Sequence, residues 1–368
     1  MRILVSGYYG FRNAGDEAIL AGMIHAIRER KPETVFTVIS GRAAETRRVH
    51  GVEAVSRNRI RATWAAVGQA DLVLSGGGSL LQDVTSAKSI PYYLGVVAMA
   101  LLRRKPVMFY AQGIGPIRGA LGKFLVRLVA NRVARITVRD PESAELLQRL
   151  GVTRPPVAVT ADAALALPPG DREAGRRLLA AAGVPAGRPL IGVSVRPWKE
   201  WEERAQQGLA RALDRLAADL GAHVVFLPMQ PTADPGAAEA VARQMTAPAT
   251  VVRDEGWTYR EALDAVAACD LLIGMRYHAL VFAAMAGVPL VGLSYDPKID
   301  AFLRQLGTAP AGSTRYLDPD ALVAAARAAW ENREESRARM ARVLAVLRER
   351  SRENARLAVE LAERRRSP

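Results

Sequence analysis

The sequence predicts an α/β protein made of two doubly wound parallel sheets in tandem, followed by C-terminal helices. Apolar runs of strand length alternate with helical periods along the chain, which is typical of parallel α/β folds. This pattern stops at the Pro- and Gly-rich stretch 164–171 and then starts again. A chain of 368 residues is also long enough for two domains.

In the first half of the chain, the apolar runs with strand length are 2–6, 35–39, 71–75, 107–111, 136–138 and 157–160. The helical periods between them are 16–30, 92–102, 121–134 and 141–150. In the second half, the predicted strands are 190–195, 224–228, 250–253, 270–273 and 290–293. Two such sheets predict a ligand-binding cleft between the domains, since ligands bind at the carboxyl ends of the strands.

The predicted domain limits are 1–165 for the first domain and 166–317 for the second, with a basic helical segment over 318–368. In this last segment, apolar side chains recur at helical spacing and arginines fill the other faces. The apolar residues are Met340, Leu344, Leu347, Leu357 and Leu361. We expect them to pack on the body of the protein; the alternative is a peripheral contact with an anionic membrane.

The formal net charge is +14, and most of the basic residues are arginine. One explanation is a genome that encodes Arg where others use Lys. The other is an anionic partner, such as a phosphorylated substrate or an anionic membrane surface. Nucleic acid is not expected as a partner, because aromatic residues make up only 6% of the chain and no recognition motif is present.

Several features predict a cytoplasmic protein, either free in the cytoplasm or peripheral at the inner face of the membrane. The chain begins with an apolar strand-like run and not with a signal-peptide pattern. Its longest apolar stretch, 92–102, is too short to cross a bilayer. A single cysteine, Cys269, excludes an internal disulfide and is typical of a reducing compartment.

A glycine-rich loop, GYYGFRNAGDEAIL at 7–20, follows the first predicted strand. Gly10, Asn13 and Gly15 are candidates for ligand binding there, because glycine lets the backbone approach a ligand next to a helix N-terminus. The glycine spacing differs from the dinucleotide fingerprint, so nicotinamide binding is not predicted. Asp16 is either a helix cap or a carboxylate that orients or deprotonates an acceptor hydroxyl.

A second glycine-rich stretch, SGGGSLLQD at 75–83, also follows a strand. We predict a loop here in which Gly76, Gly77, Gly78 and Ser79 lie next to a ligand, since a tight turn alone rarely needs three glycines. The stretch AQGIGP at 111–116 repeats this device after the next strand.

Basic side chains follow several other predicted strands. Arg139 lies at one strand end in the first half and Arg196 at another in the second half. Arg276 and His278 follow the strand 270–273, and Lys298 follows the next one. Neighbouring parallel strands lie about 5 Å apart, so these last three groups can converge on one anion. The alternative for His278 is a partly buried histidine that only begins a helix. No metal site is predicted, since no His/Cys cluster exists and the carboxylates are scattered.

Together these stretches resemble the polysaccharide pyruvyl transferase family. Within it they look most like the bacterial branch that pyruvylates a lipid-linked cell-wall polysaccharide precursor, the modification read by S-layer anchoring domains. The matching stretches run in the family's order from residue 7 to 298: GYYGFRNAGDEA, SGGGSLLQD, AQGIGP, TVRDPES, GMRYHALVFAAMAGVP and SYDPK.

The resemblance implies two Rossmann-like domains like those of GT-B glycosyltransferases, with the acceptor on the N-terminal side and the donor on the C-terminal side. It implies phosphoenolpyruvate as co-substrate, no cofactor, and a 4,6-ketal on N-acetylmannosamine of a lipid-linked precursor. Carried over by motif, the implied catalytic residues are His278, Arg139, Lys298 and Asp16. An imidazole suits general acid–base work, and the cations suit a donor that carries a carboxylate and a phosphate.

Two other functions remain open at this point. One is a GT-B-type glycosyltransferase that uses a nucleotide sugar, because it would share the fold and the basic residues. The other is a non-catalytic binder of an anionic glycan. The sequence also leaves the oligomeric state open.

Overall fold

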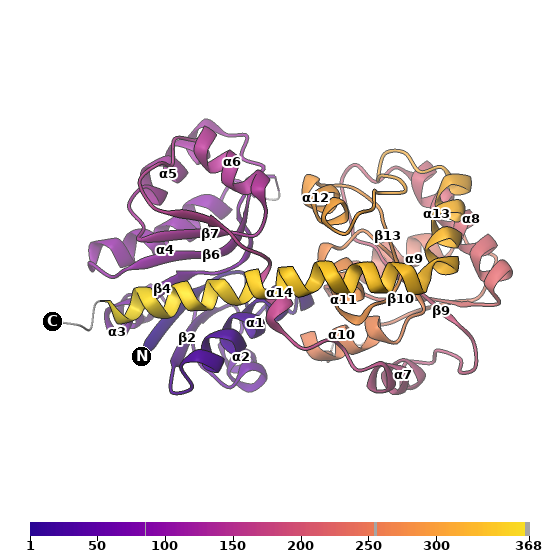
Figure 1. Ribbon diagram of the computed structural model, residues 1–368, viewed down its shortest axis with the longest axis horizontal. Coiled ribbons are helices and arrows are strands. Elements are labelled where there is room, and N and C mark those ends of the chain that lie inside the picture. Colours follow the sequence, from indigo (N-terminus) through magenta and orange to yellow (C-terminus); the bar gives the residue numbers. More distant parts are fainter. Residues whose placement is uncertain (85, 254–255, 365–368) are drawn as a thin grey trace. The chain divides into compact units, whose positions relative to one another are not determined.

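The computed structural model describes residues 1–84, 86–253 and 256–364 (Figure 1). The chain divides into two compact units. Unit 1 comprises Met1–Phe11, Asp16–Leu167 and the chain from Val346 onwards, and unit 2 comprises Arg12–Gly15 and Pro168–Ala345. Each unit contains one parallel sheet with helices around it, which confirms the predicted α/β class.

The sheet of unit 1 has eight strands in the order β3-β2-β1-β4-β6-β7-β8, with β5 paired to β6. The strands are β1 (Arg2–Ser6), β2 (Val35–Ser40), β3 (Glu53–Ser56), β4 (Leu72–Ser75), β5 (Gly78–Leu81), β6 (Val107–Ile114), β7 (Arg135–Val138) and β8 (Val157–Val159). The helices between them are α1 (Ala14–Arg30), α2 (Ala43–His50), α3 (Ile60–Gln69), α4 (Ser89–Leu102), α5 (Ala120–Ala130) and α6 (Pro141–Arg149), with a short 3₁₀ helix at Ala163–Ala166.

Apolar composition explains the central strands of unit 1. Every residue of β6 is buried, as expected for a parallel strand covered on both faces. The second glycine-rich stretch differs from the prediction, because Gly78 and Ser79 belong to β5 and are not in a loop. Sequence alone favoured a loop there because glycine is a poor strand former; here β5 is held by its pairing with β6.

The sheet of unit 2 has five strands in the order β11-β10-β9-β12-β13. These are β9 (Leu190–Ser194), β10 (His223–Phe226), β11 (Ala249–Val251), β12 (Leu271–Gly274) and β13 (Leu290–Gly292). The helices are α7 (Arg172–Ala181), α8 (Glu203–Leu220), α9 (Asp234–Ala242), α10 (Tyr259–Ala267), α11 (Tyr277–Ala286), α12 (Pro297–Gln305) and α13 (Pro319–Glu331).

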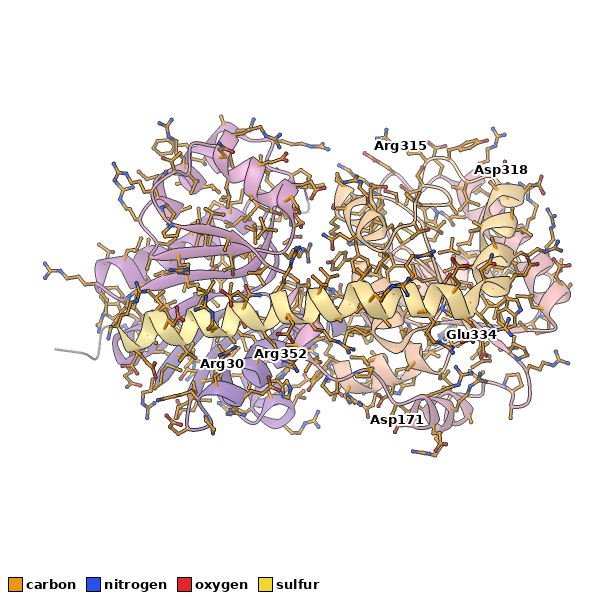
Figure 2. The ribbon with its side chains drawn as sticks, viewed as in Figure 1. Arg30, Asp171, Arg315, Asp318, Glu334 and Arg352 are labelled. Atoms are coloured by element: carbon orange, nitrogen blue, oxygen red, sulfur yellow. The ribbon has the colours of Figure 1, made fainter. Side chains whose placement is uncertain are left out.

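Aspartate caps fix the start of several helices. Asp171 begins α7 by accepting hydrogen bonds from the backbone N–H groups of Glu173 and Ala174, and Asp318 caps α13 (Figure 2). Asp140 caps α6 in the same way by accepting from the N–H of Ser143 at 2.8 Å, as its sequence context predicts.

The C-terminal helix α14 (Arg333–Glu363) carries the apolar stripe predicted for the tail. Its residues up to Ala345 belong to unit 2 and those from Val346 to unit 1. The side chains of Met340, Leu344, Leu347 and Leu357 are buried, so none of these four is available to a lipid surface. The predicted tail also includes 365–368, which lie outside the described residues.

Polar contacts also hold α14 in unit 1. Arg352 pairs with Glu29 at the end of α1, beside Arg30 (Figure 2). No helix in the described part of the chain has both the length and the apolarity needed to cross a bilayer.

Candidate active site

In unit 1, the carboxyl ends of β6 and β7 bring Gly113 and Arg139 together. Gln112 is paired in register with Val138, and Gly113 and Arg139 are the next residues. The Arg139 guanidinium is buried; it donates to an Asp162 carboxylate oxygen at 3.0 Å and to the Ser79 hydroxyl at 3.1 Å. A Cβ on Gly113 would lie 2.7 Å from this guanidinium, so glycine is needed for the arginine to fit.

Two carboxylates surround Arg139. Besides Asp162, an oxygen of Asp140 lies 3.6 Å from the arginine Nε. Burial of a charge is tolerated when it is paired and hydrogen-bonded. The structure therefore brings the predicted residues Arg139 and Ser79 together, and Asp162 is a partner that the sequence did not single out. In its local sequence Asp162 looks like an ordinary helix cap, and it does cap the short 3₁₀ helix. No local signal therefore indicates its pairing with Arg139.

Asp16 lies in the first turn of α1, next to the glycine run. A Cβ on Gly78 would be 3.0 Å from an Asp16 carboxylate oxygen. Burial of the Tyr9 hydroxyl, helped by the negative charge of Asp16, raises the pKa of Tyr9 well above its ordinary value. Asp16 is partly exposed, so its carboxylate is accessible to a substrate at this edge of the sheet.

Packing within unit 1 accounts for three predicted ligand-binding glycines. A Cβ on Gly76 would lie 2.1 Å from the Tyr9 hydroxyl, and one on Gly77 would lie 2.9 Å from a methyl carbon of Ile19. Gly10 has a positive φ of 77°, and its Cβ would lie 2.1 Å from the Ser40 hydroxyl. In these positions packing against protein atoms is enough to require glycine, and their contact with a ligand stays a prediction.

In unit 2, three strands end at the same level of the sheet. Gly274 of β12 is in register with Ser194 of β9 and with Gly292 of β13. Since the strands are parallel, the residues that follow them leave the sheet at one edge. These residues include the predicted Arg196, Arg276, His278 and Lys298.

Tyr295 lies at the centre of the positive groups at this edge. Its hydroxyl accepts a hydrogen bond from Arg196 at 3.1 Å, and the Lys298 Nζ lies 5.3 Å from its ring centre. Burial opposes ionisation of the phenol, but the charges of Lys298, Arg196 and Arg276 outweigh it, so the pKa of Tyr295 lies below its ordinary value. Tyr295 lies within SYDPK but was not predicted as a site residue; its position directly before Asp296 and three residues before Lys298 was the available signal.

The cations of this cluster differ in how closely a carboxylate neutralises their charge. The Lys298 Nζ lies 3.4 Å from an Asp296 carboxylate oxygen. The Arg196 guanidinium lies next to both the Trp198 and Tyr295 rings, at 5.0 and 5.1 Å from their centres. Among the ion pairs of the described residues, none involves Arg196, so its charge is available to an anion.

Arg276, in contrast, is bound by a buried carboxylate. Its Nε donates to Asp234 at 3.0 Å, and a second nitrogen donates to the other oxygen of the same carboxylate. Asp234 also accepts from the backbone N–H groups of Met229 and Gln230. This network favours a structural role for Arg276, which the sequence analysis had predicted to contact substrate.

His278 is the second residue of α11, and Gly15, the second residue of α1, packs on its imidazole. A Cβ on Gly15 would lie 2.1 Å from the Nδ1 atom of His278. The Ala14 N–H donates to the Met229 carbonyl at 2.8 Å, and the Asn13 side chain accepts from the Gly15 N–H at 3.0 Å. The structure thus brings the predicted residues Asn13, Gly15 and His278 together, and Gly15 is the residue that makes room for the imidazole.

Each of these two strand-edge clusters carries arginine, and the cluster of unit 2 adds a lysine and a histidine; such cations suit an anionic substrate. The sequence profile of the family "Polysaccharide pyruvyl transferase" matches residues 13–297. The chain therefore belongs to the polysaccharide pyruvyl transferase family, as its motifs predict.

One relative with a described pathway is the amylovoran biosynthesis protein AmsJ of Erwinia amylovora. It is 25% identical over 293 residues, which span 75% of this chain and 69% of AmsJ. This relative is a polysaccharide biosynthesis protein.

Solved structures confirm the fold. The Anabaena protein HepE in complex with UDP-glucose has a TM-score of 0.65, with 14% identity and 100% of both chains covered. The UDP-GlcNAc 2-epimerase of Neisseria meningitidis has a TM-score of 0.66 at 10% identity, covering 98% of this chain and 100% of the epimerase. A Rickettsia africae glycosyltransferase has a TM-score of 0.63 at 10% identity, with 98% of each chain covered. The fold is thus GT-B-like with C-terminal helices.

Proposed function

We propose that this protein transfers pyruvate from phosphoenolpyruvate to two hydroxyls of one sugar in a lipid-linked cell-wall polysaccharide precursor. The product is a 4,6-ketal, for which N-acetylmannosamine is the proposed sugar, and inorganic phosphate is released. The observation that carries the proposal is the group of cations around Tyr295 at the same sheet edge as His278. Membership of the family and the likeness to AmsJ support pyruvyl transfer to a polysaccharide.

The donor carries a carboxylate and a phosphate, so its site needs several cations. Arg196 and Lys298 are the candidates in unit 2, because their charges are less compensated than that of Arg276. Tyr295 sits between them and holds Arg196 through its hydroxyl. We assign Lys298 and Arg196 to the donor's anionic groups and Tyr295 to their positioning.

The reaction needs three proton transfers. A proton adds to the methylene carbon of phosphoenolpyruvate, which becomes a methyl group, and the neighbouring carbon becomes electrophilic. One sugar hydroxyl adds to that carbon and loses its proton, the bond to phosphate breaks, and the second hydroxyl then adds and loses its proton to close the ketal. We assign the proton transfer at the donor to His278, since an imidazole exchanges protons near neutral pH.

The acceptor side of the proposal uses unit 1. Asp16 is the partly exposed carboxylate beside Gly78, so we assign it the role of base for an acceptor hydroxyl. Arg139 is buried and paired with Asp162. We therefore assign Arg139 to stabilising developing negative charge through a fixed guanidinium, with Asp162 and Ser79 setting its orientation.

The test is incubation with phosphoenolpyruvate and a lipid-linked or synthetic disaccharide acceptor, without any nucleotide. We expect phosphate release and a mass gain of one pyruvate less one water. With His278→Ala, kcat should fall by about 10²-fold or more, as is typical when a general acid is lost. The control is His25→Ala, since His25 is exposed on α1 and pairs with Glu29.

Three results would contradict the proposal. Near-full activity of His278→Ala would remove the acid–base assignment. If turnover required a nucleotide sugar, and phosphoenolpyruvate gave no product, the protein would be a glycosyltransferase instead. Binding of acceptor without turnover under either condition would leave a non-catalytic glycan binder.

A further inference from the structure

Helix α5 of unit 1 exposes large apolar side chains on its outer face. Leu121 is 66% exposed, Phe124 is 59% exposed and Leu128 is 40% exposed. Residues three and four apart lie on one face of a helix, so these three side chains form a continuous ridge. The inner face of α5 is apolar as well, with Val126 and Ala130 fully buried.

The exposed ridge is therefore additional to the surface that holds α5 on the body. Helix α5 packs against α4 (Figure 1), and this neighbouring helix ends in another exposed leucine, Leu102. Surface helices normally present polar residues to water. An apolar outer face on a helix that is already anchored indicates a partner surface.

Charge identifies the kind of partner. Between Asp83 and Asp140 the sequence contains no acidic residue and ten basic ones. These are Lys88, Arg103, Arg104, Lys105, Arg118, Lys123, Arg127, Arg132, Arg135 and Arg139. Lys123 and Arg127 lie on α5 itself, Arg118 lies directly before it, and all three are exposed. In the described part of the chain, none of these three forms an ion pair with a carboxylate.

We propose that the outer face of α5, defined as Leu121, Phe124 and Leu128 with Arg118, Lys123 and Arg127, docks on an anionic lipid bilayer surface. Apolar side chains enter the boundary between headgroups and acyl chains while the basic groups bind lipid phosphates. A second copy of this chain is a poorer occupant, because it would bring the same basic side chains against each other. The apolar stripe of the tail is buried, so α5 and not the tail is the proposed membrane contact.

The position of α5 adds a reason for this docking. The loop that leads into α5 is fixed by Asp83, whose carboxylate accepts from the N–H groups of Arg118 and Gly119. That loop follows β6, at the sheet edge where Gly113 contacts Arg139. Docking through α5 would thus hold the candidate acceptor groups of unit 1 near the membrane, where a lipid-linked acceptor resides.

The test is sedimentation of the full chain with vesicles of phosphatidylcholine, with and without phosphatidylglycerol. We expect binding that requires phosphatidylglycerol. It should weaken as salt rises from about 0.1 M to 1 M, since the Debye length falls from about 10 Å to about 3 Å. Leu121→Ser with Phe124→Ser should lower the affinity at least about tenfold. Lys123→Gln with Arg127→Gln should lower it about fivefold for each charge removed.

Matched controls use exposed residues elsewhere. Val346→Ser removes an apolar side chain that is 54% exposed on α14, and Arg204→Gln with Arg211→Gln removes two exposed charges from α8. Both should bind like the wild type, and all variants should keep the wild-type circular dichroism and melting temperature.

The proposal is overturned if the wild type does not bind phosphatidylglycerol vesicles, or if the α5 variants bind them as well as the controls do. It is also overturned if the wild type forms a dimer that Leu121→Ser with Phe124→Ser converts to a monomer, because the face would then be a contact between copies. No donor or acceptor is used, so failure here is separate from failure of the proposed reaction.

Discussion

Because Gly15 has no side chain, the imidazole of His278 can lie directly against its backbone. A Cβ there would lie 2.1 Å from Nδ1 and 2.8 Å from the Cβ of His278, so both the ring and the backbone that carries it would have to shift. We expect Gly15→Ala to displace the ring and lower kcat by about 10- to 100-fold, because small misplacements of a catalytic group are costly. The unfolding free energy should fall as well, because the overlap reaches the Cβ of His278.

The matched control for this prediction is Gly236→Ala. Gly236 lies in α9, and a Cβ there would have no neighbour within 4 Å. Steady-state kinetics and urea unfolding of both variants decide the matter. An active Gly15→Ala enzyme would mean that His278 does not need this orientation.

Tyr295 predicts an unusual pH dependence of donor binding. As pH rises through its lowered pKa, the phenol becomes a phenolate that compensates Lys298 and Arg196, and an anionic donor should bind less well. We expect the apparent affinity for phosphoenolpyruvate to fall on the alkaline side in the wild type. In Tyr295→Phe this alkaline fall should be absent, because the variant has no phenol to ionise.

Initial rates across pH at varied phosphoenolpyruvate measure this shift. Tyr316→Phe is the control, because Tyr316 is 69% exposed in the same unit. If Tyr295→Phe and the wild type share one alkaline limb, the phenol does not titrate in the free enzyme and the assignment fails.

Among the individual residues, the sequence predicted the positions of the charged groups better than their partners. Strand ends located Arg139, His278 and Lys298 because parallel strands finish at one edge of a sheet. It could not show that Asp234 binds Arg276, since these residues lie 42 positions apart and nothing local links them. The glycine-rich stretches were predicted to lie next to a ligand, whereas the side chains of Tyr9 and Ile19 fill the space beside Gly76 and Gly77.

Helix α14 fixes the segment that leads to the Arg139 site. Asn354 is fully buried; its amide donates to the carbonyls of Ala161 and Ser351, and its oxygen accepts from Thr160. Asn354→Ala should lower the unfolding free energy by about 2–4 kcal/mol, because buried groups lose their partners. Activity should fall too, since Ala161 precedes Asp162, which holds Arg139.

Urea unfolding and kinetics test the α14 prediction. The control is Asn332→Ala, because Asn332 is exposed at the end of α13 and makes one side-chain bond to Ala328. Equal unfolding free energies for the two variants would show that the Asn354 contacts do not stabilise unit 1.

The entry to β12 has a carboxylate that stabilises unit 2. Burial opposes ionisation of Asp270, but the Leu190 N–H and Arg172 outweigh it and hold its pKa below the ordinary value. A lowered folded-state pKa stabilises above the unfolded value of about 3.9, and this contribution is lost as pH falls through the folded value.

We therefore expect Asp270→Asn to cost about 2–3 kcal/mol at neutral pH and much less in acid, once the wild-type carboxylate is protonated. Unfolding by urea at several pH values measures this difference. Asp219→Asn is the control, because Asp219 is an exposed residue paired with Arg327. A cost for Asp270→Asn that stayed constant into acid would contradict the role of its charge.

Among the elements, long apolar strands and helices were predictable, and short ones were not. The runs 107–111 and 270–273 became β6 and β12 because continuous burial demands continuous apolar residues. Strand β3 has only four residues, one of them an exposed glutamate, and its pairing to β2 leaves no periodic signal. The predicted helical tail is two helices, because the first ends at Asn332.

For the molecule as a whole, alternation and the break near 164–171 were enough to predict two parallel sheets. They could not predict that residues 12–15 belong to unit 2, or that the end of α14 belongs to unit 1. Such exchanges depend on tertiary packing and leave no trace in local composition. The cleft predicted from two tandem sheets stays a prediction.

The division of α14 also bears on synthesis by the ribosome. Thr160 is made 194 residues before Asn354, its hydrogen-bond partner, which also binds the carbonyl of Ala161. Unit 1 therefore cannot complete its interior until α14 has been made, although its strands are made first. Nascent chains that stall before α14 would carry an unfinished N-terminal half, which is a natural target for chaperones.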